Sequence, residues 1–312
     1  MLRRIIYAGV TVMLGSAIAC ACINEFDQPE TEKSHRHQIA FHGVPAAIPV
    51  DEVEYQRQIQ TLTPAIEKSP DYRQISDLAV AHLYVGETKR AIELLHQAEE
   101  LKPGEYVIAG NLGTAYELDG RNEEALKWIE EGLRRNPESH DGSEWIHANL
   151  LRAKIEMARN PGWLLDSKNS VTGLEFGDGA LPVFDSSASA PNCPKIVADI
   201  ARHLSHQLFE RRQFIPGPDP IVAALMFDLA NAIVLASPDV DAKPIYVAAR
   251  GLGYHDLGLA NKRIDAIQPL GWWLIVWGIG LLLTVGCLAI LALRLLRRQR
   301  PTGLARHSEA TA

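Results

Sequence analysis

Cysteine is scarce in this chain. Four cysteines occur among 312 residues, at Cys20, Cys22, Cys193 and Cys287, and none belongs to a Cys-x-x-Cys pair. The sequence therefore does not predict a zinc site. A glycine-rich phosphate loop, a Gly-x-Ser-x-Gly elbow and a His-Glu-x-x-His helix are missing as well. Because these are common signatures of nucleotide binding, ester hydrolysis and zinc-dependent proteolysis, we expect no assembled active site and no cofactor.

Clusters of basic residues are absent from the middle of the chain, and the net charge is −7. Proteins that bind nucleic acid usually carry such a cluster, so we expect no nucleic-acid partner. The arginines instead gather near the two ends, at Arg3 and Arg4 and then at Arg294, Arg297, Arg298, Arg300 and Arg306. Arginine at the flanks of apolar segments is a signal of membrane topology.

The stretch 72–137 contains one pattern twice, at a spacing of 34 residues. Each position of the first copy is matched 34 residues later by a residue of similar size, pairing Leu78, Ala79, His82, Gly86, Ala91, Leu95, Ala98 and Pro103 with Leu112, Gly113, Tyr116, Gly120, Ala125, Ile129, Gly132 and Pro137. A fixed period of this length predicts stacked helical hairpins. The small residues predict close helix contacts, the two turn glycines allow the turn within each hairpin, and the prolines end each second helix.

This pattern resembles the tetratricopeptide repeat (TPR). The second copy, AGNLGTAYELDGRNEEALKWIEEGLRRNP, matches the repeat at nearly every position and lacks only the leading tryptophan, where Ala109 stands. The first copy departs from the repeat at Ala79 and His82. The two copies cover about a fifth of the chain. The resemblance implies a protein-binding scaffold and no enzymatic chemistry.

In TPR proteins the partner is bound by first-helix residues that face away from the second helix. The register places ten residues there: Arg73, Ser76, Val80, Leu83, Tyr84, Val107, Gly110, Thr114, Glu117 and Leu118. TPRs that clamp a carboxyl terminus use lysine and asparagine on this face, and Val80 and Thr114 stand here instead. We therefore expect an apolar or extended peptide as the partner. The alternative is that some of these residues pack under the C-terminal helices.

Residues 1–22 read as a signal peptide or an N-terminal anchor, with an apolar run between Arg4 and Cys20. Ala17-Ile18-Ala19 before Cys20 resembles a bacterial lipobox, which would make Cys20 the lipidated residue. Simple cleavage and retention as an anchor are the alternatives. Residues 23–50 form a polar spacer that holds His35 and His37, which we expect to be solvated.

The TPR region extends over 51–160, because further amphipathic helices are predicted at 51–68 and 143–158. Residues 161–193 form an insertion, in which two apolar runs flank Gly177-Asp178-Gly179 and predict a small β-hairpin within 170–184. Residues 194–268 are predicted as a helical, TPR-like extension, with helices at about 194–214, 220–236 and 241–252.

Residues 271–293 carry no charged side chain and are long enough to cross a bilayer as a helix. Three tryptophans lie near the start of this run (Trp272, Trp273 and Trp277), and arginines follow its end. The positive-inside rule therefore predicts that the tail 294–312 is cytoplasmic and that the repeats lie on the extracytoplasmic, periplasmic side of a bacterial cytoplasmic membrane.

Candidate reactive residues are few. His203 and His206 are spaced to share a metal ion on one helix face, with Glu210 beside them, but no third ligand is identifiable, so we interpret both histidines as structural. Acidic residues surround the predicted hairpin (Glu175, Asp178 and Asp185), and we expect them to serve turn geometry and solubility.

Together these observations predict a mostly α fold: a TPR-type helical-hairpin stack with a small β-hairpin insertion and a C-terminal transmembrane helix. We expect a membrane-anchored extracytoplasmic scaffold that binds a protein partner, as assembly or envelope-complex adaptors do. The alternative is a cell-envelope enzyme or metal-binding protein that uses region 163–214.

Overall fold

The protein is described here by a computed structural model that defines residues 25–26, 50–166, 169–184, 196–212, 214–215, 217–237, 239–267 and 272–298. The chain divides into two compact units, Met1–Ile267 and Gln268–Ala312. The predicted signal segment, including Cys20, and the histidines of the polar spacer lie outside the described residues.

The first unit begins with the predicted helical hairpins. Its helices are α2 (Glu52–Lys68), α3 (Tyr72–Tyr84), α4 (Thr88–Leu101), α5 (Tyr106–Leu118), α6 (Asn122–Arg135) and α7 (Glu144–Arg159). The turns within the two repeats contain Gly86 and Gly120, whose φ angles of 80° and 79° are ones that glycine adopts without strain. The predicted pairs α3–α4 and α5–α6 are therefore confirmed.

The two helices of the second hairpin approach most closely at Gly113. A Cβ atom built at Gly113 would overlap the side chain of Ile129 on α6 and would lie 3.2 Å from the Ile129 backbone nitrogen. Ile129 and its counterpart Leu95 in the first hairpin are fully buried. Large residues thus fill the space that small residues leave open, as the repeat pattern predicts.

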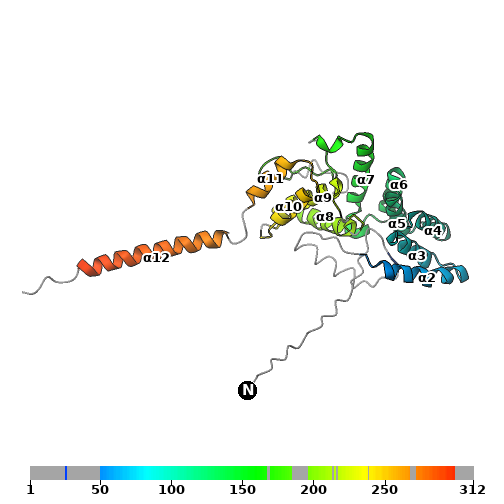
Figure 1. Ribbon diagram of the computed structural model, residues 1–312, viewed down its shortest axis with the longest axis horizontal. Coiled ribbons are helices and arrows are strands. Elements are labelled where there is room, and N and C mark those ends of the chain that lie inside the picture. Colours follow the sequence, from blue (N-terminus) through cyan, green and yellow to red (C-terminus); the bar gives the residue numbers. More distant parts are fainter. Residues whose placement is uncertain are drawn as a thin grey trace, which may run out of the picture. The chain divides into compact units, whose positions relative to one another are not determined.

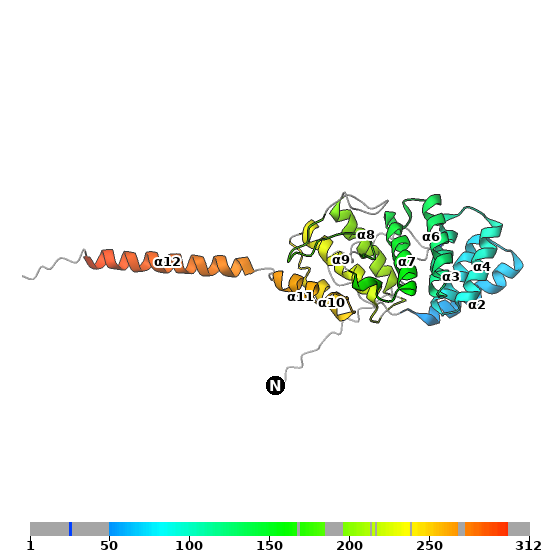
Figure 2. The same ribbon diagram turned by 90° about the horizontal axis from the view of Figure 1, so that it is seen from above.

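The rest of the unit is also helical, with η1 (Ser139–Gly142), η2 (Trp163–Leu165), α8 (Val197–Arg211), α9 (Pro220–Ala236), α10 (Lys243–Gly251) and α11 (Leu257–Ala266). Each helix from α7 to α11 packs on the next one. The start of α9 follows from its sequence, since Asp219 accepts a hydrogen bond from the Val222 amide and Pro220 occupies the first turn. In Figure 1 and Figure 2 the helices of this unit follow one another in chain order, and one core runs through them.

The predicted β-hairpin within 170–184 is wrong: the described residues of this segment form no strand. One backbone hydrogen bond crosses the loop, from the Val183 amide to the Phe176 carbonyl. Side chains of helices that are distant in sequence donate hydrogen bonds to backbone carbonyls of the loop instead. Asn149 donates to the Thr172 carbonyl, and Arg263 donates to the carbonyls of residues 176 and 177. Val171, Leu174 and Phe176 of the loop are buried in the helical core, whereas Leu181 and Val183 are exposed, so the loop is held by its first half and not by strand pairing.

The second unit contains α12 (Trp272–Arg298). By itself α12 leaves its large apolar side chains exposed, such as Trp277 and Leu282, each 74% exposed. No helix among the residues with described side chains is both long and apolar enough to cross a membrane. The membrane span expected at 271–293 stays a prediction.

Candidate functional site

The predicted binding face is largely covered within the first unit. Of its ten residues, Arg73 is exposed and Leu118 is half-buried, and the remaining eight are buried: Ser76, Val80, Leu83, Tyr84, Val107, Gly110, Thr114 and Glu117. Their role in binding a partner stays a prediction. Their burial agrees with the alternative that this face packs under the C-terminal helices.

Aromatic stacking explains the burial of Tyr84. Its ring stacks on Tyr55 of α2, with centroids 4.1 Å apart, and on Phe214 just after α8, with centroids 5.1 Å apart. The stacking of Tyr84 on Phe214 therefore connects the first hairpin to the segment that follows α8. Arg73 has a different partner, because its guanidinium lies 5.9 Å from the ring of Phe26, which belongs to the predicted spacer.

A buried charge cluster lies where α5, α7 and α8 meet, made of Glu117, Glu144, His147, Lys154 and Arg211. The Glu117 carboxylate accepts hydrogen bonds from Arg211 at 2.8 and 3.1 Å and from Lys154 at 2.6 Å. His147, fully buried, places Nε2 2.7 Å from Glu117 and Nδ1 3.0 Å from Glu144. Since carboxylate oxygens only accept hydrogen bonds, a doubly protonated imidazolium satisfies both contacts.

The cluster shifts the pKa values of its acids. Burial alone would raise the pKa of Glu117, but Arg211, Lys154 and His147 outweigh burial and hold this pKa well below its usual range. The pKa of Glu144 is lowered in the same way, against burial, by His140 and His147. Burial would lower the pKa of His140, and the neighbouring Glu144 carboxylate raises it instead. Both carboxylates are therefore ionised at neutral pH.

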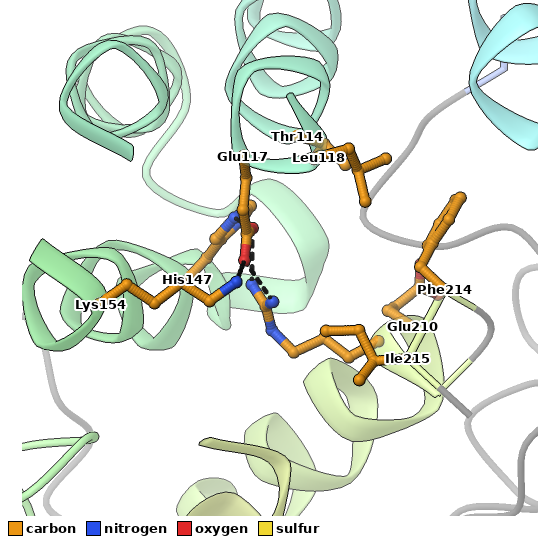
Figure 3. A pocket seen from close by; sticks show the side chains of 9 residues that line it. Thr114, Glu117, Leu118, His147, Lys154, Glu210, Phe214 and Ile215 are labelled. Carbon is orange, nitrogen blue, oxygen red and sulfur yellow. Dashed lines mark hydrogen bonds and ion pairs between the residues drawn. The ribbon is translucent and has the colours of Figure 1, made fainter. Parts of the chain in front are cut away.

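A small cavity opens beside this cluster, as Figure 3 shows. Its volume is about 50 Å³, and it is lined by Thr114, Glu117, Leu118, His147, Lys154, Glu210, Arg211, Phe214 and Ile215. We call this cavity the α5–α8 notch. Small-molecule sites usually enclose about 300–1,000 Å³, so the notch has room for one small side chain only. Three predicted residues line it: Thr114, Glu117 and Leu118.

The two histidines of α8 do not converge on one site. The Nδ1 atom of His203 lies 3.0 Å from the indole nitrogen of Trp145, whereas the ring of His206 lies 5.9 Å from that of His140. No group of three or more His, Cys, Asp or Glu among the described residues is arranged to hold a metal ion. Near the expected hairpin, Glu175 and Asp178 are exposed, and Asp185 lies outside the described residues.

Sequence reasoning missed the residues that complete the notch from outside the repeats. Arg211, Phe214 and Ile215 come from the end of α8 and the residues after it. His147 and Lys154 lie on α7, and their spacing of seven residues places them on one helix face. That spacing could have indicated that the two side chains share a site, but a polar face of a helix is usually exposed to solvent.

The sequence model described as "Tetratricopeptide repeat" matches residues 82–159. This region carries tetratricopeptide repeats. The match runs from the end of α3 to the last residue of α7, so it includes the α5 and α7 residues of the notch.

The "TPR repeat-containing protein YpiA" of Bacillus subtilis (strain 168) is 33% identical to this chain over 102 residues. The matched part is 33% of this chain and 24% of the relative, so the chain spans about a quarter of that protein. No solved structure matches the chain significantly.

Proposed function

We propose that the chain is a scaffold that binds a segment of a protein partner at the α5–α8 notch. The observation that carries this proposal is the position of the notch. It opens on first-helix residues of a tetratricopeptide repeat, and repeats of this kind generally bind proteins. Glu117, Thr114 and Leu118 come from the repeat, and α7 and α8 supply the other walls.

The walls of the notch indicate the chemistry of the bound segment. Leu118, Phe214 and Ile215 provide apolar contacts, and the charges behind them are already paired with one another. A small aliphatic side chain of an extended peptide fits this combination. Lys154, whose side chain is 23% exposed, lies at the edge where a peptide carbonyl would pass. Buried anchors of this kind commonly contribute about 2 kcal/mol or more to binding.

Exchange of Leu118 for alanine tests the proposal. Leu118→Ala should weaken copurification of the partner with the full chain by at least about tenfold, because about 1.4 kcal/mol of lost contact has this effect. Leu126→Ala is the matched control, since Leu126 is also a half-buried leucine of the same hairpin and lies on α6 outside the notch. Equal binding by the two variants would contradict the proposal.

We also propose that the scaffold is held at the outer face of a bacterial cytoplasmic membrane. The support is the sequence of 271–293, which has no charge, begins with tryptophans and is followed by arginines. A helix that is apolar on all sides needs an apolar environment, and a bilayer supplies one. Lipidation of Cys20 would add a second attachment.

Reporter fusions test this topology. A reporter that is active only in the cytoplasm should work after Ala312 and fail when inserted near Gly104 in the turn before α5. A reporter that is active only outside the cytoplasm should give the opposite pattern. Activity of the cytoplasmic reporter at both positions would contradict the proposed location.

A further inference from the structure

A second and larger cavity lies between α6, η1, α7 and α8. Its volume is about 740 Å³, within the range of ligand sites. Two buried side chains, Trp145 and His203, form part of its wall, and most of the other lining residues are charged: Glu130, Arg134, Glu138, Asp141, Arg152, Asp199 and Arg202. The cavity shares no lining residue with the α5–α8 notch.

Hydrogen-bond donors surround the His203 ring on both sides. The indole N–H of Trp145 lies 3.0 Å from Nδ1, and Nη2 of Arg202 lies 3.1 Å from Nε2. Indole and guanidinium groups only donate hydrogen bonds, so a neutral imidazole with one proton can accept from one of them. The second nitrogen carries the proton and faces a donor with which it cannot pair.

Burial decides which nitrogen carries the proton. Trp145 is 2% exposed, and its buried indole N–H would be left without an acceptor if Nδ1 were protonated. Arg202 has a side chain that is 39% exposed and can turn towards water at little cost. Trp145 therefore donates to Nδ1, and Nε2 carries the proton.

This tautomer leaves the Nε2–H group of His203 without an acceptor. Nε2–H and Nη2 of Arg202 lie side by side at the cavity, and no acceptor among the described residues lies within hydrogen-bond distance of Nε2, whereas Nη1 of Arg202 donates to the Asp141 carbonyl at 3.3 Å. His203 is 5% exposed. A buried donor of this kind needs an acceptor, and an oxygen atom of a ligand can serve both groups.

The surrounding charges decide what kind of oxygen fits. Arg134 and Arg152 are paired with Glu131 and Glu130, each at 2.5 Å. Two other carboxylates of the wall, on Glu138 and Asp199, outnumber the remaining cation, Arg202, whose guanidinium lies 3.6 Å from Asp199 and 4.0 Å from Asp141. An anionic ligand would meet these negative charges, whereas a neutral carbonyl would not, and a basic side chain would be attracted.

We propose that this cavity binds a basic peptide segment, whose backbone carbonyl accepts hydrogen bonds from His203 and Arg202. A lysine or arginine next to that carbonyl contacts the carboxylates of the wall. This site is distinct from the α5–α8 notch and gives the scaffold a second point of attachment with its own specificity.

Calorimetric titration of the full chain with short peptides tests the proposal. The probes are N-acetylated, C-amidated Gly-Ala-Lys-Ala-Gly and its analogues with glutamine or glutamate in place of lysine, so that no terminal charge contributes. The lysine peptide should bind saturably and at least about tenfold more tightly than either analogue. Equal affinities, tighter binding of the glutamate peptide or no saturable binding would overturn the proposal.

Variants of two carboxylates of the cavity wall provide a second test. Glu138→Gln combined with Asp199→Asn should lower the affinity for the lysine peptide at least about tenfold, whereas Glu123→Gln, at an exposed position of α6 outside the cavity, should not change it. Leu118→Ala should also leave this binding unchanged, which separates the site from the notch.

Nitrogen-15 NMR of the His203 ring should show the proton on Nε2, and its resonance should shift on addition of peptide. A proton on Nδ1 in the free protein would overturn the proposal as well.

Discussion

Arg211 of α8 reaches across 94 residues of sequence to form a two-point ion pair with Glu117 of α5, and both side chains are 6% exposed. This pair joins a tetratricopeptide repeat to the helices that follow the insertion. The predicted binding face of the second repeat consequently packs against α7 and α8, and residues of α5, α7 and α8 line the notch that opens there.

Loss of the Glu117 charge should strongly destabilise the fold. Glu117→Gln leaves Arg211 buried without its counter-charge, and breaking a buried pair in this way typically costs about 3–5 kcal/mol. Urea unfolding of the full chain, followed by tryptophan fluorescence, measures this loss. The control is Glu130→Gln, which breaks the half-exposed pair with Arg152 and should cost about 1 kcal/mol or less. Similar losses in the two variants would contradict a buried role for Glu117.

The same cluster predicts acid sensitivity. The pKa of Glu117 is held well below the unfolded value of 4.5, so its ion pairs contribute fully above pH 4.5, and their contribution falls as the pH drops below it. Glu117→Gln has no carboxyl group to protonate. Its free energy of unfolding should therefore fall less steeply than that of the original chain between pH 4.5 and pH 3, as urea titrations at each pH would show.

Asp228 of α9 should have the opposite effect on stability. Burial raises the pKa of Asp228 from 3.8 to about 7, against the opposing effects of Thr172, Asn231 and Arg263. The folded state keeps this proton after the unfolded state has lost it, so stability falls as pH rises from about 4 to about 7. Asp228→Asn removes the ionisation and should stabilise the chain by about 4 kcal/mol at pH 7.5, while changing little at pH 4, because each pKa unit corresponds to about 1.36 kcal/mol.

Unfolding free energies of Asp228→Asn and the original chain across pH 4–8 check this expectation. If the unfolding free energy of the variant still declines above pH 6.5, that decline comes from groups such as His140, whose pKa is raised by Glu144 against the effect of burial. A constant difference between the two chains at every pH would show that Asp228 is ionised throughout.

Two glycines of the second repeat should respond oppositely to alanine. Gly113→Ala places a Cβ atom into Ile129 and should cost about 1–3 kcal/mol through overpacking. At Gly132 the nearest atom would be 3.6 Å from the new Cβ, so Gly132→Ala should be neutral or stabilise the helix by up to about 1 kcal/mol. Thermal melts of the two variants compare them directly, and an inverted order would show that the repeat register is wrong.

The helical hairpins could be predicted because the interactions that specify them are local and repeated. The spacing of 34 residues identifies the turn glycines, and the packing of Gly113 against Ile129 follows from the register. The loop at 169–184 could not be predicted in this way. Its apolar runs and Gly177-Asp178-Gly179 resemble a hairpin sequence. The carbonyl groups of the loop, however, accept hydrogen bonds from Asn149 and Arg263, which lie on helices distant in sequence.

About a third of the residues that line the candidate site could be predicted from the sequence. The repeat register identified Thr114, Glu117 and Leu118, which do line the notch. Arg211 and Phe214 could not be found, because their approach depends on how α8 packs against α7, and no local pattern encodes that packing. The same packing explains why Tyr84, predicted to face a groove, is stacked between two rings.

Site-specific photo-crosslinking tests most directly whether the α5–α8 notch holds a partner segment. A photoreactive amino acid at position 118 of the full chain, expressed in its native cells, should give one discrete covalent adduct, and peptide mass spectrometry should map the link to an extended segment of a single protein. The same amino acid at position 126 should give no such adduct. Adducts of equal yield from both positions, or from neither, would contradict binding at the notch.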